Sequence, residues 1–487
     1  MCRFYVGKYL LDCNQTKVIL DNSKYLLVVA GAGSGKTLTI VGKIKYLIDY
    51  KNVNPSEILC ISFTNESVNS MKEKINNQNV EVMTFHKLAL NILDRNKISY
   101  SICESSYLEY VIHEFLFGII YESNFLMKTI LKYYGKYSVF CNIERSYSKL
   151  LKQNYDEICS FERLICKFIK LFKANNHTLA PFSVFLKKFL KRKDKFFILI
   201  VLNIYLIYQN ELYSSGKIDF DDMITMAIKT LQNNGFIDKY KYIIIDEFQD
   251  TSYIRYLLIK TIIDKNQSKL VAVGDDFQSI YRFSGCDLKI FTEFKNYFKG
   301  ANILKIENTY RNSLELINIS SKFILKNPLQ VRKKLLSNKS NSKPIKICYG
   351  YTLEELIMFI KGNIMILGRN NKDINKYEND SFNSHNDINI RYLTIHRSKG
   401  LEEDNVIILN VIDDNLGIPN KIEDSSILRL VLKKNEYKYA EERRLFYVAL
   451  TRCRESVYLM TEKGRESVFI KELLRYKDSS IEVLKKE

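Results

Sequence analysis

The chain is poor in proline and glycine, with 5 Pro and 18 Gly among 487 residues. Because these residues interrupt helices and strands, their scarcity predicts long, uninterrupted elements, most of them helices. The composition, 46% apolar and 26% charged, excludes a disordered chain. The length exceeds what one ordinary core holds and predicts roughly three domains or subdomains.

Paired cysteines and long apolar runs are also missing. The 10 cysteines include no Cys-x-x-Cys pair, which argues against a structural zinc or iron–sulfur site and fits reduced thiols. The longest apolar stretch, Phe196 to Tyr208, contains Asn203 and is shorter than the ~20 residues of a membrane span, so we expect a buried helix there. The first residues carry no hydrophobic signal segment. We therefore expect a cytoplasmic protein without a membrane partner.

Positive charge exceeds negative charge: 74 Lys and Arg against 55 Asp and Glu give a formal net charge of +19. This balance favours a polyanionic partner, either a nucleic acid or an anionic surface. The chain is also rich in Lys, Asn, Ile and Tyr, as AT-biased coding produces, and some of the basicity then carries no function. The basic cluster from Lys187 to Lys193 fits a nucleic-acid backbone and a solvated helix face equally well.

A glycine-rich segment after an apolar run is the most informative motif. Leu26 to Val29 predicts a strand, and apolar residues at helical spacing begin at Ile40. Between them stands Ala30-Gly31-Ala32-Gly33-Ser34-Gly35-Lys36-Thr37. In this arrangement backbone N–H groups and a helix N-terminus cradle phosphates, Lys36 reaches the β- and γ-phosphates, and the Thr37 hydroxyl ligates Mg²⁺. The sequence therefore predicts a nucleoside-triphosphate site, with Ala30 where the usual pattern has glycine.

A second, acidic segment completes this type of site. The apolar run from Tyr242 to Ile245 predicts a buried strand, and Asp246 and Glu247 follow at its carboxyl end. Asp246 is placed to hold Mg²⁺, and Glu247 is placed to polarise the attacking water. Hydrolysis also requires cations for the charge that develops on the transferred phosphoryl group. Arg311 and Arg452, far along the chain, are the candidates.

Strand-like and helical stretches alternate in two regions of the chain. Residues 1–95 and 213–300 carry the two motifs and are expected to form one α/β domain. A helical, aromatic and basic insertion is expected between them at residues 96–212. A second α/β domain is expected at 301–475, followed by a tail at 476–487. Two such cores imply a cleft between them.

Taken in order, the motifs resemble superfamily 1 helicases of the UvrD/Rep type, over nearly the whole chain from about Leu10 to Met460. The segments that carry the resemblance are Leu11-Asp12-Cys13-Asn14-Gln15, Ala30 to Thr37, Ser62-Phe63-Thr64-Asn65, Thr84-Phe85-His86, Ile218-Asp219-Phe220-Asp221-Asp222, Asp246-Glu247-Phe248-Gln249-Asp250, Gly274-Asp275-Asp276-Phe277-Gln278-Ser279-Ile280-Tyr281, Thr309-Tyr310-Arg311, His396 to Glu402 and Glu441 to Arg452. Ala30 matches the family's own form of the phosphate loop. The resemblance implies an α/β fold of two RecA-like parallel-sheet domains, with an α-helical insertion in the first.

Three further segments are similar to the helicase IV branch of this family. They are Asn327-Pro328-Leu329-Gln330, Gly417-Ile418-Pro419, and Arg282-Phe283-Ser284-Gly285, where other members carry Trp-Arg. The stretch between Arg369 and Thr394 is too short for the large accessory domain of relatives, so we expect only a polar loop at 371–388. The N-terminal extension of longer helicase IV proteins is expected to be absent as well.

The resemblance implies ATP and Mg²⁺ as cofactors and assigns residues to them. The implied nucleotide-binding residues are Gln15, Ala30, Gly31, Ala32, Gly33, Ser34, Gly35, Lys36, Thr37, Tyr310 and Glu402, with Thr37 and Asp246 as metal ligands. The implied catalytic residues are Lys36, Asp246, Glu247, Gln278, Arg311 and Arg452. Among these, Gln15 would read adenine, Tyr310 would stack on it, Gln278 would sense the γ-phosphate and Arg452 would be the arginine finger.

The resemblance also implies DNA as the partner. The implied DNA-binding residues are Phe63, Thr64, Asn65, Thr84, Phe85, His86, Tyr281, Phe283 and His396. We expect a DNA-dependent ATPase that acts as a 3′-to-5′ helicase or translocase on single-stranded DNA and on duplex DNA with a 3′ tail. The alternative is a nucleotide-switched DNA-binding subunit of a repair or anti-phage defence complex, with a protein as a further partner.

Overall fold

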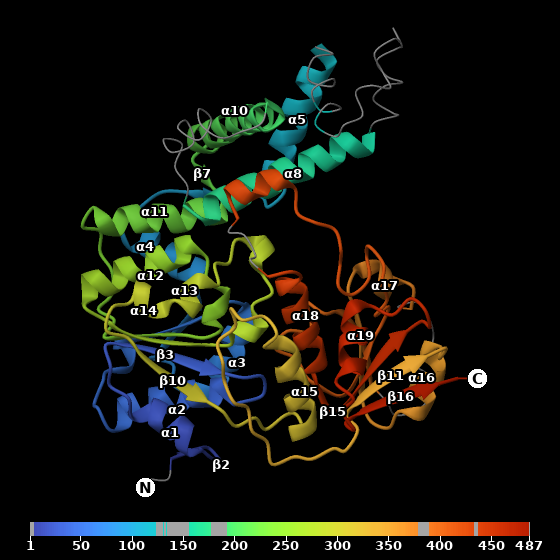
Figure 1. Ribbon diagram of the computed structural model, residues 1–487. Helices are drawn as coiled ribbons and strands as arrows, with labels where there is room; N and C mark the ends of the chain where they lie inside the picture. Colours follow the sequence, from blue (N-terminus) through green and yellow to red (C-terminus); the bar gives the residue numbers. More distant parts are fainter. Residues whose placement is uncertain are drawn as a thin grey trace.

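The computed structural model describes residues 4–122, 130, 133, 155–176, 192–377, 389–432 and 437–486. These residues form two α/β domains side by side and a helical insertion that rises above the first domain (Figure 1). The side chains of the basic cluster Lys187 to Lys193 and residues 378–388 of the expected polar loop lie outside this description.

The first domain is built on a six-stranded parallel sheet in the order β10-β3-β9-β8-β4-β5. Its strands are β3 (Tyr25–Ala30), β4 (Ile58–Ser62), β5 (Glu81–Thr84), β8 (Tyr242–Ile245), β9 (Lys269–Gly274) and β10 (Asn302–Ile306). Helices cover both faces, so the strands are continuous apolar runs rather than alternating patterns.

Successive residues of each strand in this sheet enter opposite cores. On β3, Leu26 and Val28 join the core under α1 (Cys13–Leu20), α2 (Lys36–Asp49) and α3 (Asn65–Ile75). Leu27 and Val29 join the core on the other face. The helices of that second face are α4 (Phe85–Arg95), α11 (Phe220–Gln232), α12 (Tyr253–Asn266), α13 (Lys289–Thr292) and α14 (Phe294–Tyr297).

The described part of the insertion comprises α5 (Tyr107–Glu122), α8 (Tyr155–Ala174) and α10 (Arg192–Ser214), joined to the first domain near the two-stranded pair β6 (Ser101–Ile102) and β7 (Lys217–Ile218). The helix expected at 196–208 is present within α10 but is buried on one side only. Ile204 and Tyr208 are inside, whereas Leu199 is 49% exposed. By length and composition the Asp194–Ser214 stretch could cross a membrane, and 39% of its most apolar window is buried within the protein.

The second domain holds another six-stranded parallel sheet in the order β13-β12-β14-β15-β11-β16. Its strands are β11 (Ile345–Tyr349), β12 (Ile364–Gly368), β13 (Ile390–Thr394), β14 (Glu403–Ile408), β15 (Cys453–Thr461) and β16 (Ile481–Lys485). One face is covered by α15 (Leu314–Ile324), α18 (Ala440–Leu450) and α19 (Val468–Arg475), the other by α16 (Leu353–Phe359) and α17 (Asn371–Asn375). The two sheets confirm the expected α/β class with two RecA-like domains.

Two expected domain boundaries are wrong. Residues 302–306 were assigned to the second domain, but they form β10, which pairs with β3 of the first sheet. Residues 476–487 were assigned to a tail, but β16 pairs with β11 in the second sheet. Both strands lie at sheet edges, where half-exposed residues dilute the apolar pattern that identifies a buried strand.

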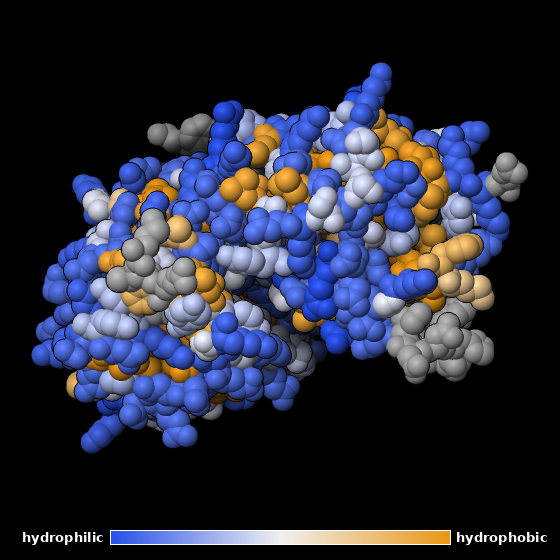
Figure 2. Space-filling model, turned by 90° about the horizontal axis from the view of Figure 1, so that it is seen from below, coloured by the Kyte–Doolittle hydropathy of each residue, from blue (hydrophilic) through white to orange (hydrophobic). Residues whose placement is uncertain are grey.

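The outer surface matches this arrangement of cores. Seen from below, it is mainly hydrophilic, with hydrophobic residues scattered among polar ones (Figure 2). Such a pattern is usual for a chain whose large apolar side chains face internal sheets.

Candidate functional site

The glycine-rich segment joins β3 to α2 at the carboxyl edge of the first sheet. Two of its glycines, Gly33 and Gly35, have φ of +67° and +75°, which side chains rarely adopt. Close neighbours also exclude larger residues, because a Cβ on Gly33 would lie 2.5 Å from the Arg311 Cβ. Ala30, the residue that departs from the usual pattern, ends β3 and is fully buried. A small buried residue therefore fits that position as well as glycine does.

The two acidic residues follow β8, as the sequence predicts, and lie close to the glycine-rich segment. The Nζ of Lys36 is 3.6 Å from Oε1 of Glu247. Glu247 has φ +50°, an uncommon left-handed conformation for a side chain of this size. Such backbone strain concentrates at functional sites, since surrounding structure must hold it in place.

The two carboxyl groups have opposite pKa shifts. Burial, reinforced by the charge of Glu247, raises the pKa of Asp246 above its usual range. Burial also acts to raise the pKa of Glu247, but Lys36 and Lys399 outweigh it and hold that pKa below its usual range. Glu247 is therefore ionised at neutral pH. Asp246 is a buried carboxyl group that a nearby divalent cation would keep ionised.

Two arginines outside the first sheet, Arg311 and Arg452, meet this cluster from the second domain. The Nη2 of Arg452 donates to Oε1 of Gln278 at 2.9 Å, and Nε2 of Gln278 donates to Asp275 at 2.6 Å. Arg311 donates to Glu402 at 2.6 Å. Burial, together with the nearby charge of Arg311, lowers the pKa of Arg452 to about 9. Desolvated cations of this kind stabilise negative charge more strongly than exposed ones.

Gln15 and Tyr310 contact the glycine-rich segment between Gly33 and Gly35. The Gln15 side chain donates to the backbone carbonyl of Ser34 at 3.2 Å and also caps α1. Tyr310 is half exposed, and its hydroxyl donates to Asp12 at 2.9 Å. The backbone N–H of Tyr310 donates to Gly33. The structure thus brings the expected nucleotide residues of both domains together around one loop.

A wide cleft of about 1120 Å³ separates the helical insertion from the first domain. His86 and Phe283 line it, and Phe283 is 47% exposed. Tyr281 and His396 lie beside Phe283, and the His396 and Phe283 rings are 5.5 Å apart. These aromatic residues come from both domains and lie next to one another.

The other expected nucleic-acid contacts have different surroundings. Thr64 and Asn65 are exposed at the start of α3, which Thr64 caps, and Thr84 caps α4. Phe63 is half buried. Phe85 is only 2% exposed and packs in the core of the first domain, so its ring offers no surface to a ligand. The assignment of Phe85 as a direct contact is therefore wrong, because the first residue of α4 faces the sheet.

The two histidines near these surfaces are neutral at pH 7. Burial, with the charge of Arg255, lowers the pKa of His86 to about 4. Burial, with the charges of Arg369 and Lys399, lowers the pKa of His396 to about 4. Neutral imidazoles can stack and exchange hydrogen bonds, but they add no charge to attract a phosphate.

Three residues that motif reasoning did not single out belong to this region. The Arg255 guanidinium lies over the rings of Phe63 and Phe85, at 5.3 and 5.7 Å from their centroids, and lines the cleft. Phe220, 47% exposed, also lines the cleft and meets His86 edge to face at 5.2 Å. Lys399 is bonded to Asp250 and, at 2.8 Å, to the carbonyl of Gln278. Phe220 and Lys399 stand within motifs that the sequence offered, whereas Arg255 has no sequence signal beyond its charge.

Together, the fold and the site define a class: a phosphate-loop nucleotide site between two RecA-like domains, beside an aromatic cleft. Comparison with known families identifies the group within that class. Residues 11–299 match the UvrD/REP helicase N-terminal domain, and residues 370–464 match the UvrD-like helicase C-terminal domain. The chain belongs to the UvrD/Rep helicase family.

Individual relatives are similar at moderate identity. DNA helicase IV of Escherichia coli is 28% identical over 485 residues, which cover 96% of this chain and 70% of the relative. A probable DNA helicase II homolog of Mycoplasma capricolum is 31% identical over 358 residues, 71% of this chain and 45% of the relative. The ATP-dependent DNA helicase PcrA of Staphylococcus aureus is 28% identical over 404 residues, 81% of this chain and 49% of the relative. The matched parts thus cover less than half of the last two relatives.

Proposed function

We propose that this chain is an ATP-driven motor that moves 3′ to 5′ along single-stranded DNA and separates duplex DNA with a 3′ tail. The observation that carries the proposal is the bond between Arg452 of the second domain and Gln278 of the first, 2.9 Å long, next to the Lys36–Glu247 pair. A nucleotide bound at Lys36 would alter the contacts between the two domains. Its hydrolysis would therefore change how the domains sit relative to each other.

The proposed chemistry divides among residues that the structure brings together. Lys36 and the backbone N–H groups of the glycine-rich segment bind the β- and γ-phosphates. Glu247, which is ionised, orients the attacking water. Arg311 and Arg452 stabilise the charge that develops on the transferred group. Glu247 pairs with Lys36, Arg311 lies against Gly33, and Arg452 bonds to Gln278.

Mg²⁺ fits this site because the nearby donors are oxygen atoms. The Thr37 hydroxyl and the Asp246 carboxylate would hold the ion, since a hydroxyl and a carboxylate are ligands that Mg²⁺ prefers. The raised pKa of Asp246 supports this assignment, as burial leaves the group in need of a positive partner. A bound Mg²⁺ would offset the charge of the phosphates.

ATP is the nucleotide we infer, from two residues that contact the glycine-rich segment, Gln15 and Tyr310. The half-exposed ring of Tyr310 can stack on adenine. Gln15 is buried and its amide already bonds to Ser34 and to the backbone of Asp12, so its second amide N–H is the donor that remains to contact the base. Glu402 would act indirectly, because its carboxylate holds Arg311 in position.

The proposed DNA path follows the exposed aromatic residues. The exposed rings of Phe283 and Phe220, together with the half-buried ring of Tyr281, are platforms on which bases can stack without regard to sequence, at about 1–3 kcal/mol per base. Thr64 and Asn65, exposed at the start of α3, can hydrogen-bond to the phosphate backbone near a helix N-terminus. Arg255, which lines the cleft and lies over the ring of Phe63, supplies a positive charge for the phosphate backbone.

Hydrolysis with and without single-stranded DNA tests the proposal, together with displacement of duplexes that carry a 3′ or a 5′ tail. We expect strong stimulation by DNA and displacement from the 3′ tail. RNA of the same sequence tests whether DNA is the preferred strand. Stimulation without displacement indicates a translocase that removes bound proteins. Hydrolysis that DNA leaves unchanged contradicts the motor, and the nucleotide-switched binding subunit then becomes the better explanation.

Lys36→Ala is the matched loss-of-function variant for these assays. Removing a cation that contacts the transferred phosphates lowers kcat by about 100-fold or more. DNA binding without nucleotide should stay at the wild-type level, because Lys36 lies outside the aromatic cleft. Retained hydrolysis in this variant shows that the nucleotide site lies elsewhere.

A further inference from the structure

A segment of the second domain is buried in the core of the helical insertion. Residues 422–432, which we call the strap, contain the short helical turn η7 (Ser426–Leu430). Figure 1 shows this orange-red turn lying along α8. The strap residues that enter the insertion core, each at most 7% exposed, are Ile427, Leu428, Val431 and Leu432. Since these apolar side chains leave water on docking, the strap is held firmly to the insertion.

Polar contacts surround this apolar anchor. The Asn175 side chain, just beyond α8, donates to the backbone carbonyl of Val431 at 3.0 Å. The hydroxyl groups of Tyr133 and Ser425 lie 3.0 Å apart. The Nζ of Lys167 on α8 lies 2.7 Å from Oδ1 of Asp424. The strap is thus fixed to the insertion by apolar burial and by directed bonds.

Asp424 also contacts the first domain. Its second oxygen accepts from Nη2 of Arg282 at 2.5 Å, and Nε of Arg282 donates to Glu441 at 2.9 Å. Arg282 stands between Tyr281 and Phe283, the aromatic residues beside the cleft. The Arg-Phe form of this segment, singled out in the sequence as typical of the helicase IV branch, therefore turns its arginine away from the cleft and toward the second domain.

Helix α18 connects this junction to the nucleotide site. Glu441 lies in its first turn. Arg444, further along, donates to the carbonyl of Ser279 at 2.5 Å, and Arg452, just beyond the helix, reaches Gln278. One helix therefore contacts the 278–283 loop at the end that faces the nucleotide and at the end that faces the cleft.

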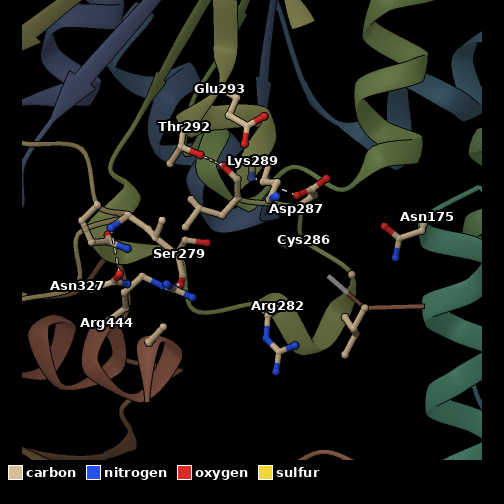
Figure 3. Close-up of a pocket in the computed structure, with 16 residues that line it drawn as sticks. Asn175, Ser279, Arg282, Cys286, Asp287, Lys289, Thr292, Glu293, Asn327 and Arg444 are labelled. Atoms are coloured by element: carbon tan, nitrogen blue, oxygen red, sulfur yellow. Dashed lines mark hydrogen bonds between the residues drawn. The ribbon is translucent and has the colours of Figure 1, made fainter. Parts of the chain in front are cut away.

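A cavity of about 180 Å³ lies beside the junction. It is lined by Asn175 just beyond α8, Arg444 from α18, Leu432 from the strap, and Arg282. In Figure 3, Arg282 is seen between Arg444 on one side and Asn175 on the other. The cavity lies between α18 and the end of α8. The strap, which bonds to Asn175 beyond α8, therefore links the two sides of the cavity.

We propose that the strap ties the helical insertion to the second motor domain, with Asp424 as the positioning residue that holds Arg282 of the loop against Lys167 of the insertion. Movement of α18 when the nucleotide cleft closes then reaches the insertion through the strap. This inference rests on the motor function proposed above. It adds that the insertion follows the nucleotide state instead of standing as a fixed wall of the cleft.

Asp424→Asn tests the link, with Asp413→Asn as the matched control. Asp413 pairs with Lys421 at 2.5 Å, with exposure close to that of the Lys167–Asp424 pair, but both partners belong to the second domain. We expect Asp424→Asn to lower the DNA-stimulated kcat and the displacement rate about three- to tenfold, since it weakens two partly exposed ion pairs. The unstimulated rate and the KM for ATP should not change. Asp424→Glu, which keeps the charge, should recover much of the loss, and Asp413→Asn should behave as wild type.

Hydrogen exchange supplies a readout that does not depend on motor activity. A non-hydrolysable ATP analogue should change amide exchange in α8 of the wild type, and Asp424→Asn should reduce that change while protection at the phosphate loop persists. If α8 never responds to the analogue, or responds equally in both proteins, the link is refuted. If α8 responds but DNA fails to stimulate the wild type, the motor function fails and the link stands. Equal melting temperatures of Asp424→Asn and Asp413→Asn exclude a general loss of stability.

Discussion

Arg255 shows how a single side chain can be placed for binding without belonging to a motif. Its guanidinium rests on the faces of Phe63 and Phe85, and no carboxylate lies within ion-pair distance of it among the described residues. By contrast, Lys173 in the same cleft is held between Asp219 and Asp222. Stacking on two rings fixes the direction of Arg255 and leaves its charge available to a phosphate.

Arg255→Gln should therefore weaken DNA binding without affecting hydrolysis at saturating DNA. We expect the Kd for single-stranded DNA to rise about five- to twentyfold. The slope of log Kd against log salt concentration should fall by the amount that corresponds to about one phosphate contact. Fluorescence anisotropy at several salt concentrations measures both. Lys265→Gln, an exposed charge on the same helix, is the control and should bind as wild type. An unchanged salt dependence in Arg255→Gln would show that its guanidinium does not meet a phosphate.

Asp221, which lines the same cleft, should make DNA binding dependent on pH. Burial, then the charge of Asp219, raises the pKa of Asp221 to about 6, against the opposing charges of Lys173 and Arg255. Above pH 6 the carboxylate is charged and repels phosphates, and below pH 6 it is neutral. His86 stays neutral throughout this range because its pKa is about 4.

Binding of single-stranded DNA should therefore tighten about two- to fivefold between pH 7.5 and pH 5.5 at constant salt. Asp221→Asn should bind tightly at both values, with most of the pH dependence gone. Anisotropy without nucleotide measures this directly. A pH dependence that is the same in the variant assigns the effect to another group.

Sequence predicts residues well where a motif fixes both chemistry and position. Lys36, Glu247 and Gln278 meet as expected, because loops at the carboxyl edges of parallel strands converge, and Arg452 reaches them from the end of α18. Phe85 was misassigned, since a motif does not reveal which way the first residue of a helix faces. Asp424 could not be found, because its partners lie far away in the chain and its neighbours carry no pattern.

Among the elements, β16 is the clearest case of a structured segment that the sequence suggests is a tail. It extends the second sheet by pairing with β11, and its residues Ile481 and Leu484 pack on neighbouring cores. Its sequence, Ile-Glu-Val-Leu-Lys, mixes apolar and charged residues without a regular pattern, and none of the five is fully buried. Composition near a chain end cannot tell such a strand from a loose tail, because the pairing partner is more than a hundred residues away.

Ending the chain after Ser480 should destabilise the second domain. Loss of the strand ladder and of two partly buried apolar side chains should lower its unfolding free energy by about 2–4 kcal/mol. Urea unfolding followed by circular dichroism measures the shift. Val483→Ser, which alters an exposed position of the same strand, should have little effect. Equal stability of the shortened and full chains would restore the interpretation as a tail.

The strands at 26–29 and 242–245 were predictable, because buried parallel strands are continuous apolar runs. The assignment of β10 was not, since which sheet a short strand joins depends on pairing over long distances. The insertion was predicted as helical, but its contact with the strap was not. Helical spacing indicates that a face is buried without indicating what covers it.

At the scale of the whole molecule, the net charge of +19 should appear as a strong salt dependence of DNA binding. If about four phosphates are neutralised, the affinity for single-stranded DNA should fall about 50-fold between 50 and 200 mM salt. Titrations with a labelled oligonucleotide give the slope. A slope near zero would mean that the basicity reflects coding bias rather than a nucleic-acid path.

The place of β10 determines how the two domains can move. This strand lies beside β3, and the chain leaves it toward Thr309, whose hydroxyl donates to the carbonyl of Ala32 at 2.8 Å. The covalent crossing between the domains is thus part of the wall of the nucleotide site. A pivot placed there gives little travel at the base of ATP and much more at the distant aromatic cleft. In the motor proposed above, a small change around the phosphates would then become a larger displacement at the aromatic cleft.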